Sequence, residues 1–317
     1  MKTVFFGTPE FSVPSLEVLH LHPNVEVAAV VSMPDRRAGR GKQLQSPPVA
    51  TFAKENNIPL IQTENINKDE DALKLLHSIE ADFFIVIAFA QFLGSKILKM
   101  PKLGAFNIHT SLLPKYRGAA PIQYALLNGD KETGVSIQKM VKKMDAGDIC
   151  YEHKVTISDD DTSATLFKKL EGEAALGLTN FLETLVKKPD QVSYRQQNDS
   201  EATFAPTIKK QDGLINPFNF SATEILNQLR AYTPWPGLFI FISDQRLKVT
   251  ELELFPQSLE AGQIDHKLGA LLLGTKEGTL RLKSVQPEGK KPQEDKNYLN
   301  GLKSKSVIPT LDRNHYE

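Results

Sequence analysis

The segment with the richest chemistry in this chain runs from Gly104 to Pro114. Asn107 and His109 flank Ile108 in a strand-like stretch, so both side chains point to one face, with their positions roughly 6.5 Å apart. An amide donor beside an imidazole can stabilise an oxyanion and move a proton. Asp145, in a later glycine-containing loop, adds a carboxylate. This set suits transfer of an acyl group to an amine without a protein nucleophile.

Each of these residues also has an ordinary structural interpretation. Asn-x-His alone indicates little, because hydrogen-bonded polar residues are common in protein cores. The single cysteine, Cys150, lies in the apolar stretch Ile-Cys-Tyr, and we interpret it as a small core residue rather than a nucleophile. The seven histidines show no metal-ligand spacing, so we expect no metal site.

Length and composition are typical of a soluble, two-domain protein. The chain has 317 residues, of which 40% are hydrophobic and 24% charged. The longest apolar run, residues 83–90, has the length of a strand and not of a membrane span. The N-terminus resembles no signal peptide, so we expect a cytoplasmic protein. Lys plus Arg and Asp plus Glu both number 38, a balance that argues neither for nor against a nucleic-acid partner.

The first half of the chain alternates strand and helix patterns. This alternation predicts an α/β, Rossmann-like, mostly parallel sheet that binds ligands at the carboxyl ends of its strands. The predicted strands are 3–6, 25–31, 82–90 and 104–109, and the predicted helices carry Phe11, Leu16 and Leu19 or lie at 49–55 and within 69–79.

The second half completes this domain and begins another. Strands at 133–140 and 149–157 flank Asp145, and a long helix at 162–187 closes a catalytic domain spanning residues 1–189. Residues 190–206 are polar and predict a linker. Residues 207–317 predict a small antiparallel β-barrel, OB-like, with one helix at 222–230 and strands at 238–242, 247–254, 270–273 and 279–285.

A basic loop follows the second predicted strand. Arg36, Arg37, Arg40 and Lys42 lie within seven residues that also contain two glycines. At this edge of an α/β sheet such a loop can reach phosphates, although a solvated run of charge has about the same pattern. Gly7-Thr8-Pro9 lacks the Gly-x-Gly-x-x-Gly pattern, which disfavours a nicotinamide cofactor.

Three further segments give the Asn107 and His109 pair a family context. Residues 111–114 (Ser-Leu-Leu-Pro) follow directly, residues 115–121 open a helix, and residues 145–148 (Asp-Ala-Gly-Asp) follow the next strand. As a set these residues strongly resemble the folate-dependent formyltransferases, which use N10-formyltetrahydrofolate as formyl donor.

Within that superfamily the chain resembles the methionyl-tRNA formyltransferase family over essentially its whole length. The motifs at residues 6–9, 34–42, 230–237 and 285–291 carry the resemblance. It implies formyl transfer from N10-formyltetrahydrofolate to the α-amine of initiator methionyl-tRNA, by an enzyme whose C-terminal barrel also binds tRNA. We expect a monomer, because nothing in the sequence suggests an obligate partner. The residues implied are Asn107, His109 and Asp145 for catalysis, Phe89, Ala90, Ser111, Leu112, Leu113 and Pro114 for folate, and Arg36, Arg37, Arg40 and Lys42 for tRNA.

The sequence also departs from the family pattern. Phe89-Ala90 replaces Tyr-Gly, Thr110 replaces Gly, and Asn216-Pro217-Phe218 replaces Asp-Trp. Two alternatives stay open: a formyltransferase acting on an amino sugar nucleotide, and an inactive RNA-binding module on the same scaffold. The basic loop and residues 286–291 favour tRNA over the sugar nucleotide, and retention of all three catalytic positions argues against the inactive module. The isomer of the Leu113-Pro114 bond is also left open.

Overall fold

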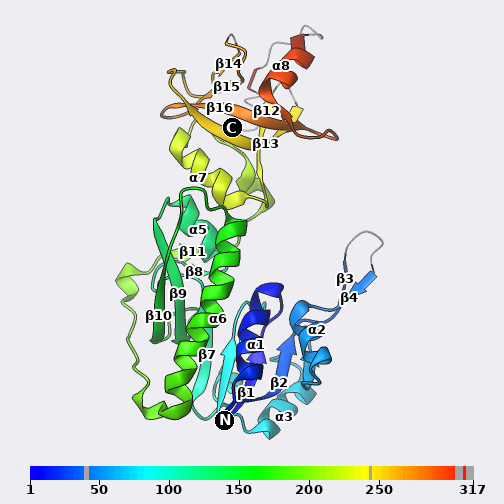
Figure 1. The fold of residues 1–317 in the computed structure, drawn as a ribbon, viewed down its shortest axis with the longest axis vertical. Helices are drawn as coiled ribbons and strands as arrows, with labels where there is room; N and C mark the ends of the chain where they lie inside the picture. Colours follow the sequence, from blue (N-terminus) through cyan, green and yellow to red (C-terminus); the bar gives the residue numbers. More distant parts are fainter. Residues whose placement is uncertain (39–42, 243–244, 267, 304–309, 312–317) are drawn as a thin grey trace. The chain divides into compact units, whose positions relative to one another are not determined.

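The computed structural model describes residues 1–38, 43–242, 245–266, 268–303 and 310–311 (Figure 1). Two compact units make up the chain, and neither is one continuous stretch of sequence. The first unit contains Met1–Pro121, Glu132–Thr156 and Phe167–Ala205, and the second contains Ile122–Lys131, Ile157–Leu166 and Pro206–Glu317. Each unit is described by itself below.

A seven-stranded sheet forms the centre of the first unit, in the order β10-β9-β7-β6-β1-β2-β5. The strands from β5 to β7 run parallel, and β9 and β10 are antiparallel additions at one edge. The predicted mostly parallel sheet is therefore confirmed. The strands are β1 (Lys2–Phe6), β2 (Glu26–Ser32), β5 (Leu60–Gln62), β6 (Phe83–Val86), β7 (Gly104–His109), β9 (Glu132–Lys139) and β10 (Ile149–Thr156).

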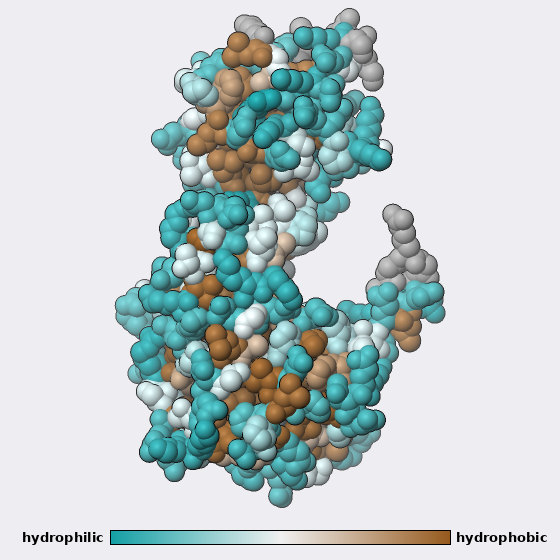
Figure 2. Space-filling view, viewed as in Figure 1, coloured by the Kyte–Doolittle hydropathy of each residue, from teal (hydrophilic) through white to brown (hydrophobic). Residues whose placement is uncertain are grey.

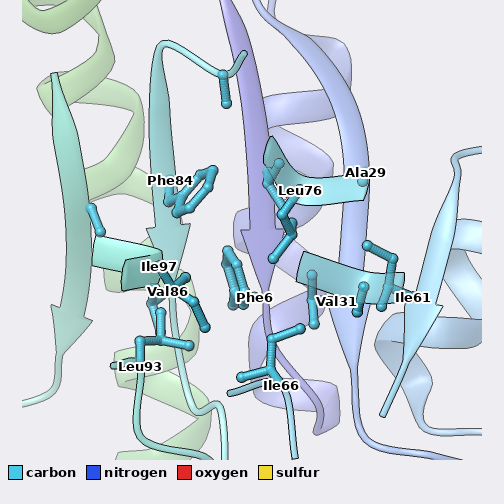
Figure 3. Close-up of a cluster of buried hydrophobic side chains, with 14 residues drawn as sticks. Phe6, Ala29, Val31, Ile61, Ile66, Leu76, Phe84, Val86, Leu93 and Ile97 are labelled. Carbon is cyan, nitrogen blue, oxygen red and sulfur yellow. The ribbon is translucent and has the colours of Figure 1, made fainter. Parts of the chain in front are cut away.

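Helices cover both faces of this sheet. Phe6 and Phe84 pack with Leu76 of α3 on one face (Figure 3). On the other face, the ring of Phe106 packs edge-to-face against Phe181 of α6, with centroids 5.1 Å apart. Burial of these large side chains fixes the strands whose carboxyl ends carry the polar residues. The helices of this unit are α1 (Val13–Leu21), α2 (Pro48–Glu55), α3 (Glu70–Ile79), α4 (Ser95–Leu98) and most of α6 (Ser163–Lys187), with a 3-10 turn, η1 (Glu10–Ser12), before α1. Helix α5 (Pro121–Leu127) belongs, apart from its first residue, to the second unit.

The strand predicted at residues 82–90 ends earlier, at Val86. Ile87 is still buried, but Ala88 has a positive φ of 46°, a conformation incompatible with an extended strand. The apolar run continues past the strand because Ile87 and Phe89 pack into the core from a turn. The length of the run was therefore a poor guide to the length of the strand.

Residues 190–206, whose polar composition predicts a linker, lie mostly within the first unit. Arg195 and Ile149 exchange two backbone hydrogen bonds of 2.9 Å. The short strand β11 (Phe204–Ala205) pairs in parallel with β8 (Arg117–Gly118). The segment thus runs alongside the part of the sheet that bears the polar site. Two 3-10 turns, η2 (Pro189–Gln191) and η3 (Asp199–Glu201), interrupt it.

The second unit is an antiparallel sheet with the order β12-β13-β16-β15-β14, to which β17 adds beside β16. Among the described residues the two edges do not pair, so the predicted small barrel is a curled half-barrel. Figure 2 shows apolar side chains gathered on part of the visible surface of this unit. The strands are β12 (Leu238–Ile242), β13 (Gln245–Phe255), β14 (Ile264–Asp265), β15 (Leu272–Gly274), β16 (Thr279–Pro287) and β17 (Gln293–Glu294).

Helices and an ion pair complete the second unit. The helix α7 (Ala222–Tyr232) begins at a capping box, in which Ser221 and Glu224 satisfy each other's backbone N–H groups. The helix α8 (Asp295–Lys303) begins with a fully buried carboxylate, which the guanidinium of Arg281 holds at 2.7 Å. Helix α8 and the short 3-10 turn η4 (Lys210–Gly213) are elements that the sequence patterns did not predict.

Candidate active site

Strand β7 places Asn107 and His109 at the carboxyl end of the parallel sheet. Its neighbours are β6 on one side and the antiparallel β9 on the other, where Asn107 lies opposite Gln138 and His109 opposite Ser136. Directly opposite residues in an antiparallel pair project to the same face. The sheet register therefore brings Gln138 to the face that carries the two predicted catalytic side chains.

Asp145 reaches the same face from the loop between β9 and β10. Its carboxylate accepts three hydrogen bonds: from Gly118 N at 2.9 Å to Oδ2, and from Gln138 Nε2 at 3.0 Å and Asn107 Nδ2 at 3.4 Å to Oδ1. The Asp145 side chain is only 12% exposed. The structure therefore brings all three predicted catalytic residues together around one carboxylate.

His109 lies between Asp145 and a backbone carbonyl. Its Nε2 is 2.9 Å from the carbonyl oxygen of Tyr116, and its Nδ1 is 3.9 Å from Asp145 Oδ2. A carbonyl oxygen only accepts, so Nε2 carries the proton of the neutral ring and Nδ1 presents a lone pair. Nδ1 is thus the ring nitrogen able to accept a proton, and it lies 3.9 Å from the Asp145 carboxylate.

The loop that carries Asp145 has an unusual backbone conformation. Asp145 has φ of 49°, in the left-handed region. Two residues later, Gly147 passes so close to β9 that an added Cβ would lie 1.7 Å from the carbonyl oxygen of Lys139. The glycine at this position is therefore required by the close approach of two backbones.

Gln138 and Gln197 belong to this site, although the sequence patterns predicted neither. Gln197 Nε2 donates to the carbonyl oxygens of Asp145 at 2.9 Å and Gly147 at 2.7 Å. Strand alternation on residues 133–140, set against the neighbouring strand, could have indicated Gln138. No local pattern could have indicated Gln197, which lies in the segment interpreted as a linker.

The segment predicted to contact folate is anchored by its own hydrogen bonds. The Ser111 hydroxyl donates to the Lys115 carbonyl oxygen at 2.6 Å, and the Ser136 hydroxyl donates to the Ser111 carbonyl oxygen at 2.7 Å. Ser111 and Leu113 are buried, whereas Leu112 and Pro114 are partly exposed. The Leu113–Pro114 peptide bond is cis. Leu112 and Pro114 are therefore the members of this segment with side-chain surface open to a ligand.

The other predicted folate residues follow β6. Phe89 is partly buried and packs edge-to-face against Phe6, with ring centroids 5.5 Å apart. Ala90 is exposed. Thr110, the departure beside His109, is buried. Of these two departures from the family pattern, Ala90 is therefore the one whose side chain is open to a ligand.

Part of the basic loop forms a hairpin of β3 (Arg36–Ala38) and β4 (Gln43–Gln45). Arg36 is exposed and pairs with Glu64 at 3.0 Å, and Arg37 is exposed. The other two predicted tRNA contacts, Arg40 and Lys42, lie outside the described residues.

Asp35 anchors the base of this hairpin. Its Oδ1 accepts from Gln62 Nε2 at 2.6 Å, and Lys54 Nζ lies 3.5 Å from its Oδ2. Hydrogen bonds from Gln62 and Ser46, together with Lys54, hold the pKa of the Asp35 carboxyl below its usual value. These contacts of Asp35 therefore fix the position at which the hairpin begins.

The Cys150 thiol takes no part in the site. Burial raises the pKa of the Cys150 thiol to about 12, so the thiolate is scarce at neutral pH. Within the described part of the chain, no three His, Cys, Asp or Glu side chains gather as a metal ion would need. In the same part of the chain, no helix has the length and apolar character of a membrane span.

Comparisons with known proteins place this chain in a family. A formyl transferase family model matches residues 1–182, and a formyl transferase C-terminal domain model matches residues 207–303. Methionyl-tRNA formyltransferase from Thermodesulfovibrio yellowstonii is 41% identical over 300 residues, which cover 95% of this chain and 96% of the relative. The chain belongs to the methionyl-tRNA formyltransferase family. A second methionyl-tRNA formyltransferase, from Lactobacillus delbrueckii, is 42% identical over 304 residues and 95% of both chains.

Solved structures confirm the fold of this methionyl-tRNA formyltransferase family member. An N-formyltransferase from Helicobacter canadensis, in complex with folinic acid and dTDP-3-aminofucose, has a TM-score of 0.66 at 19% identity over 90% of this chain and 99% of its own. Phosphoribosylglycinamide formyltransferase from Bacillus halodurans has a TM-score of 0.50 at 22% identity over 61% of this chain and 99% of its own.

Proposed function

We propose that this chain transfers the formyl group of N10-formyltetrahydrofolate to the α-amine of methionine on initiator methionyl-tRNA. The observation that carries the proposal is the convergence of Asn107 and His109 on Asp145, in a chain 41% identical to a methionyl-tRNA formyltransferase across 95% of its length. An amide, an imidazole and a carboxylate are the groups that such a transfer needs.

Asn107 supplies the donor for the oxyanion. As the amine nitrogen bonds to the formyl carbon, the formyl oxygen becomes negatively charged. The Asn107 amide has two N–H groups, and one points at Asp145 over a long 3.4 Å contact. In the proposed reaction the second N–H donates to the oxyanion, a contribution worth about 2.7–4 kcal/mol of barrier.

His109 moves the proton. Its Nδ1 lone pair accepts the proton that the attacking amine loses, directly or through a water, and Asp145 at 3.9 Å stabilises the imidazolium formed. The same proton then passes to the folate nitrogen as the bond between that nitrogen and the formyl carbon breaks. The Tyr116 carbonyl keeps the ring oriented throughout, because it holds Nε2 at 2.9 Å.

The folate contacts are proposed on Phe89 and Ala90 and on residues 111–114. Leu112 and Pro114 offer partly exposed apolar surface. Ser111 and Leu113 are buried, and the Ser111 hydroxyl donates to the Lys115 carbonyl oxygen. The hydrogen bonds of Ser111 and Ser136 give this segment a fixed shape before a ligand arrives.

The tRNA contacts are proposed on the β3–β4 hairpin and on the second unit. Arg36 and Arg37 are exposed cations on an anchored hairpin, and Arg40 and Lys42 lie in the same loop sequence. Cations of this kind bind phosphates in a manner that depends on salt. We further propose that the enzyme acts in the cytoplasm as a monomer.

A three-substrate assay tests the proposal. Purified protein receives formyl-folate with methionyl initiator tRNA, with an amino sugar nucleotide or with buffer alone, and the N-formyl product is measured. We expect product with the tRNA only. Product with the sugar nucleotide alone would make the chain a sugar formyltransferase, and no product with either would leave an inactive RNA-binding module.

A further inference from the structure

A buried arginine behind the site begins a series of hydrogen bonds that ends at Asp145. Arg117 is 2% exposed, and its Nε and Nη2 donate to Gln197 Oε1 at 3.1 and 2.7 Å. Its remaining nitrogen, Nη1, pairs with Asp199 at 2.8 Å. A guanidinium has donors and no acceptor. The oxygen of the Gln197 amide must therefore face Arg117, which settles the orientation of that side chain.

Because the Gln197 oxygen faces Arg117, its NH2 group must face the Asp145 loop. There Nε2 meets three acceptors: the carbonyl oxygens of Asp145 and Gly147, and Gln138 Oε1 at 3.3 Å. Gln138 Oε1 also accepts from the Gly147 backbone N–H at 3.0 Å. Two donors now fix the oxygen end of Gln138.

The last step follows from the orientation of Gln138. With its oxygen committed to Gly147 and Gln197, its Nε2 can only point the other way, where it donates to Asp145 Oδ1 at 3.0 Å. Every hydrogen bond from Arg117 to the carboxylate thus has one permitted direction. Reversal of any amide would set donor against donor or acceptor against acceptor.

We propose that Arg117, Gln197 and Gln138 are positioning residues that hold Asp145 in register with His109 for formyl transfer. The inference rests on the proposed function. Asp145 needs such support because its left-handed backbone is disfavoured for a residue with a side chain. The contacts fix both its main chain, through Gln197, and its carboxylate, through Gln138.

A second anchor acts on the same loop from outside. Lys143 Nζ and Arg117 Nη1 bind the two carboxylate oxygens of Asp199, at 2.5 and 2.8 Å. The loop residue Lys143 is therefore tied to the same arginine that orients Gln197. Residues 197–199 therefore hold the loop that carries Asp145 in place and are more than a connection between the two domains.

The variant Gln197→Glu tests the proposal with little change of shape. It keeps an oxygen towards Arg117 but places a second oxygen against the carbonyls of Asp145 and Gly147. The control is Gln196→Glu, the same chemical change at the exposed neighbouring position. We expect kcat of Gln197→Glu to fall about 10²-fold, the cost of misplacing a reacting group, with KM for both substrates close to wild type and the melting temperature lower by only a few degrees because buried acceptors then face each other. The control should match wild type in all four quantities.

Amide hydrogen exchange gives a readout that is independent of activity. The Gly147 N–H is protected by Gln138 Oε1, so the peptide covering residues 141–149 should exchange faster in Gln197→Glu and at the wild-type rate in Gln196→Glu. If Gln197→Glu does not fold, Gln138→Glu replaces it, because that change keeps an oxygen towards Gly147 and Gln197 and puts a carboxylate oxygen in place of the NH2 that donates to Asp145 Oδ1.

The possible outcomes distinguish a failure of the positioning role from a failure of the proposed function. Wild-type kcat and wild-type exchange in Gln197→Glu would overturn the positioning role. A fall in stability and a rise in KM that account for all lost activity would also overturn it. Absence of formyl transfer by the unmutated protein would overturn the proposed function instead, and exchange at Gly147 would then still decide whether Gln197 and Gln138 hold the loop.

Discussion

The Asp145 carboxylate and the His109 imidazole face each other with 3.9 Å between Oδ2 and Nδ1, beyond direct hydrogen-bond distance. All three hydrogen bonds to the carboxylate come from other donors: Gly118, Gln138 and Asn107. Asp145 thus acts on His109 through its charge, and its own position is fixed independently of the histidine. A carboxylate held in this way is sensitive to changes that preserve shape and remove charge.

Asp145→Asn is such a change. It removes the charge beside His109 and places an NH2 group against either Gly118 N–H or the Gln138 amide, so donor meets donor. We expect kcat to fall about 10²–10⁴-fold, the range for loss of general acid–base assistance. Steady-state kinetics with methionyl initiator tRNA check this. A variant that keeps wild-type kcat would remove Asp145 from the mechanism.

Asn107→Ala removes the proposed oxyanion donor. We expect a loss of about 10²–10³-fold in kcat with a small change in KM, because the oxyanion exists only in the transition state. Thermal unfolding should show a folded protein. If KM rises and kcat stays constant, Asn107 binds the substrate in its ground state and does not stabilise the oxyanion.

Gly147→Ala tests the close approach of the Asp145 loop to β9. The added Cβ would lie 1.7 Å from the Lys139 carbonyl oxygen, so the loop must move and activity should fall by about 10²-fold. Gly172→Ala is the matched control, since its added Cβ meets nothing within 4 Å on α6. That control should keep full activity and gain about 0.5–1 kcal/mol in unfolding free energy. Equal activity in the two variants would contradict the account of the loop.

Arg37→Ala tests the proposed tRNA contact of the β3–β4 hairpin. We expect KM for tRNA to rise, kcat to change little, and the dependence of log KM on log salt to flatten by about 0.7–0.9 for one lost phosphate contact. The control Lys74→Ala removes an exposed cation from α3. Parallel salt series for Arg37→Ala and wild type would show that Arg37 contacts no phosphate.

The buried Asp295 in the second unit gives a prediction of pH dependence. Burial alone would raise the pKa of this carboxyl, but the hydrogen bonds from Arg281 and from the Leu271 N–H outweigh it and lower the pKa. A lowered native pKa stabilises the fold above the unfolded pKa of about 3.9 and loses that contribution as pH falls through the lower native pKa.

Denaturant unfolding of wild type at several pH values below about 5 should therefore show falling stability. Asp295→Asn should lose about 3 kcal/mol at neutral pH, because it leaves the charge of Arg281 without its partner, and should show less of this acid dependence. Asp71→Asn, at an exposed carboxylate, is the control and should follow wild type. An unchanged acid dependence in Asp295→Asn would place the titrating group elsewhere.

Local pattern predicted most of the first unit. The runs at 3–6, 104–109 and 133–140 became β1, β7 and β9 with shifts of one residue or none, because burial and alternation along a strand are visible in sequence. The strand at 82–90 was too long because hydrophobicity reports burial and not backbone conformation. The end at Val86 depends on a left-handed Ala88, which composition does not reveal.

The site was predictable in part for a similar reason. Asn107 and His109 share one strand, and Asp145 lies in a recognisable loop motif, so residue type and spacing found all three. Gln197 reaches the site from 52 residues beyond Asp145, and its role depends on a hydrogen bond to a backbone carbonyl. Contacts of that kind follow from the folded path of the chain and leave no sequence signature.

Formyl transfer to methionyl initiator tRNA, measured side by side for wild type, Asn107→Ala and Asp145→Asn, decides whether these residues carry out the proposed reaction. We expect N-formylmethionyl-tRNA from wild type in the presence of formyl-folate, and a product rate at least about 10²-fold lower from each folded variant. Equal rates in all three proteins, or no product from wild type, would contradict it.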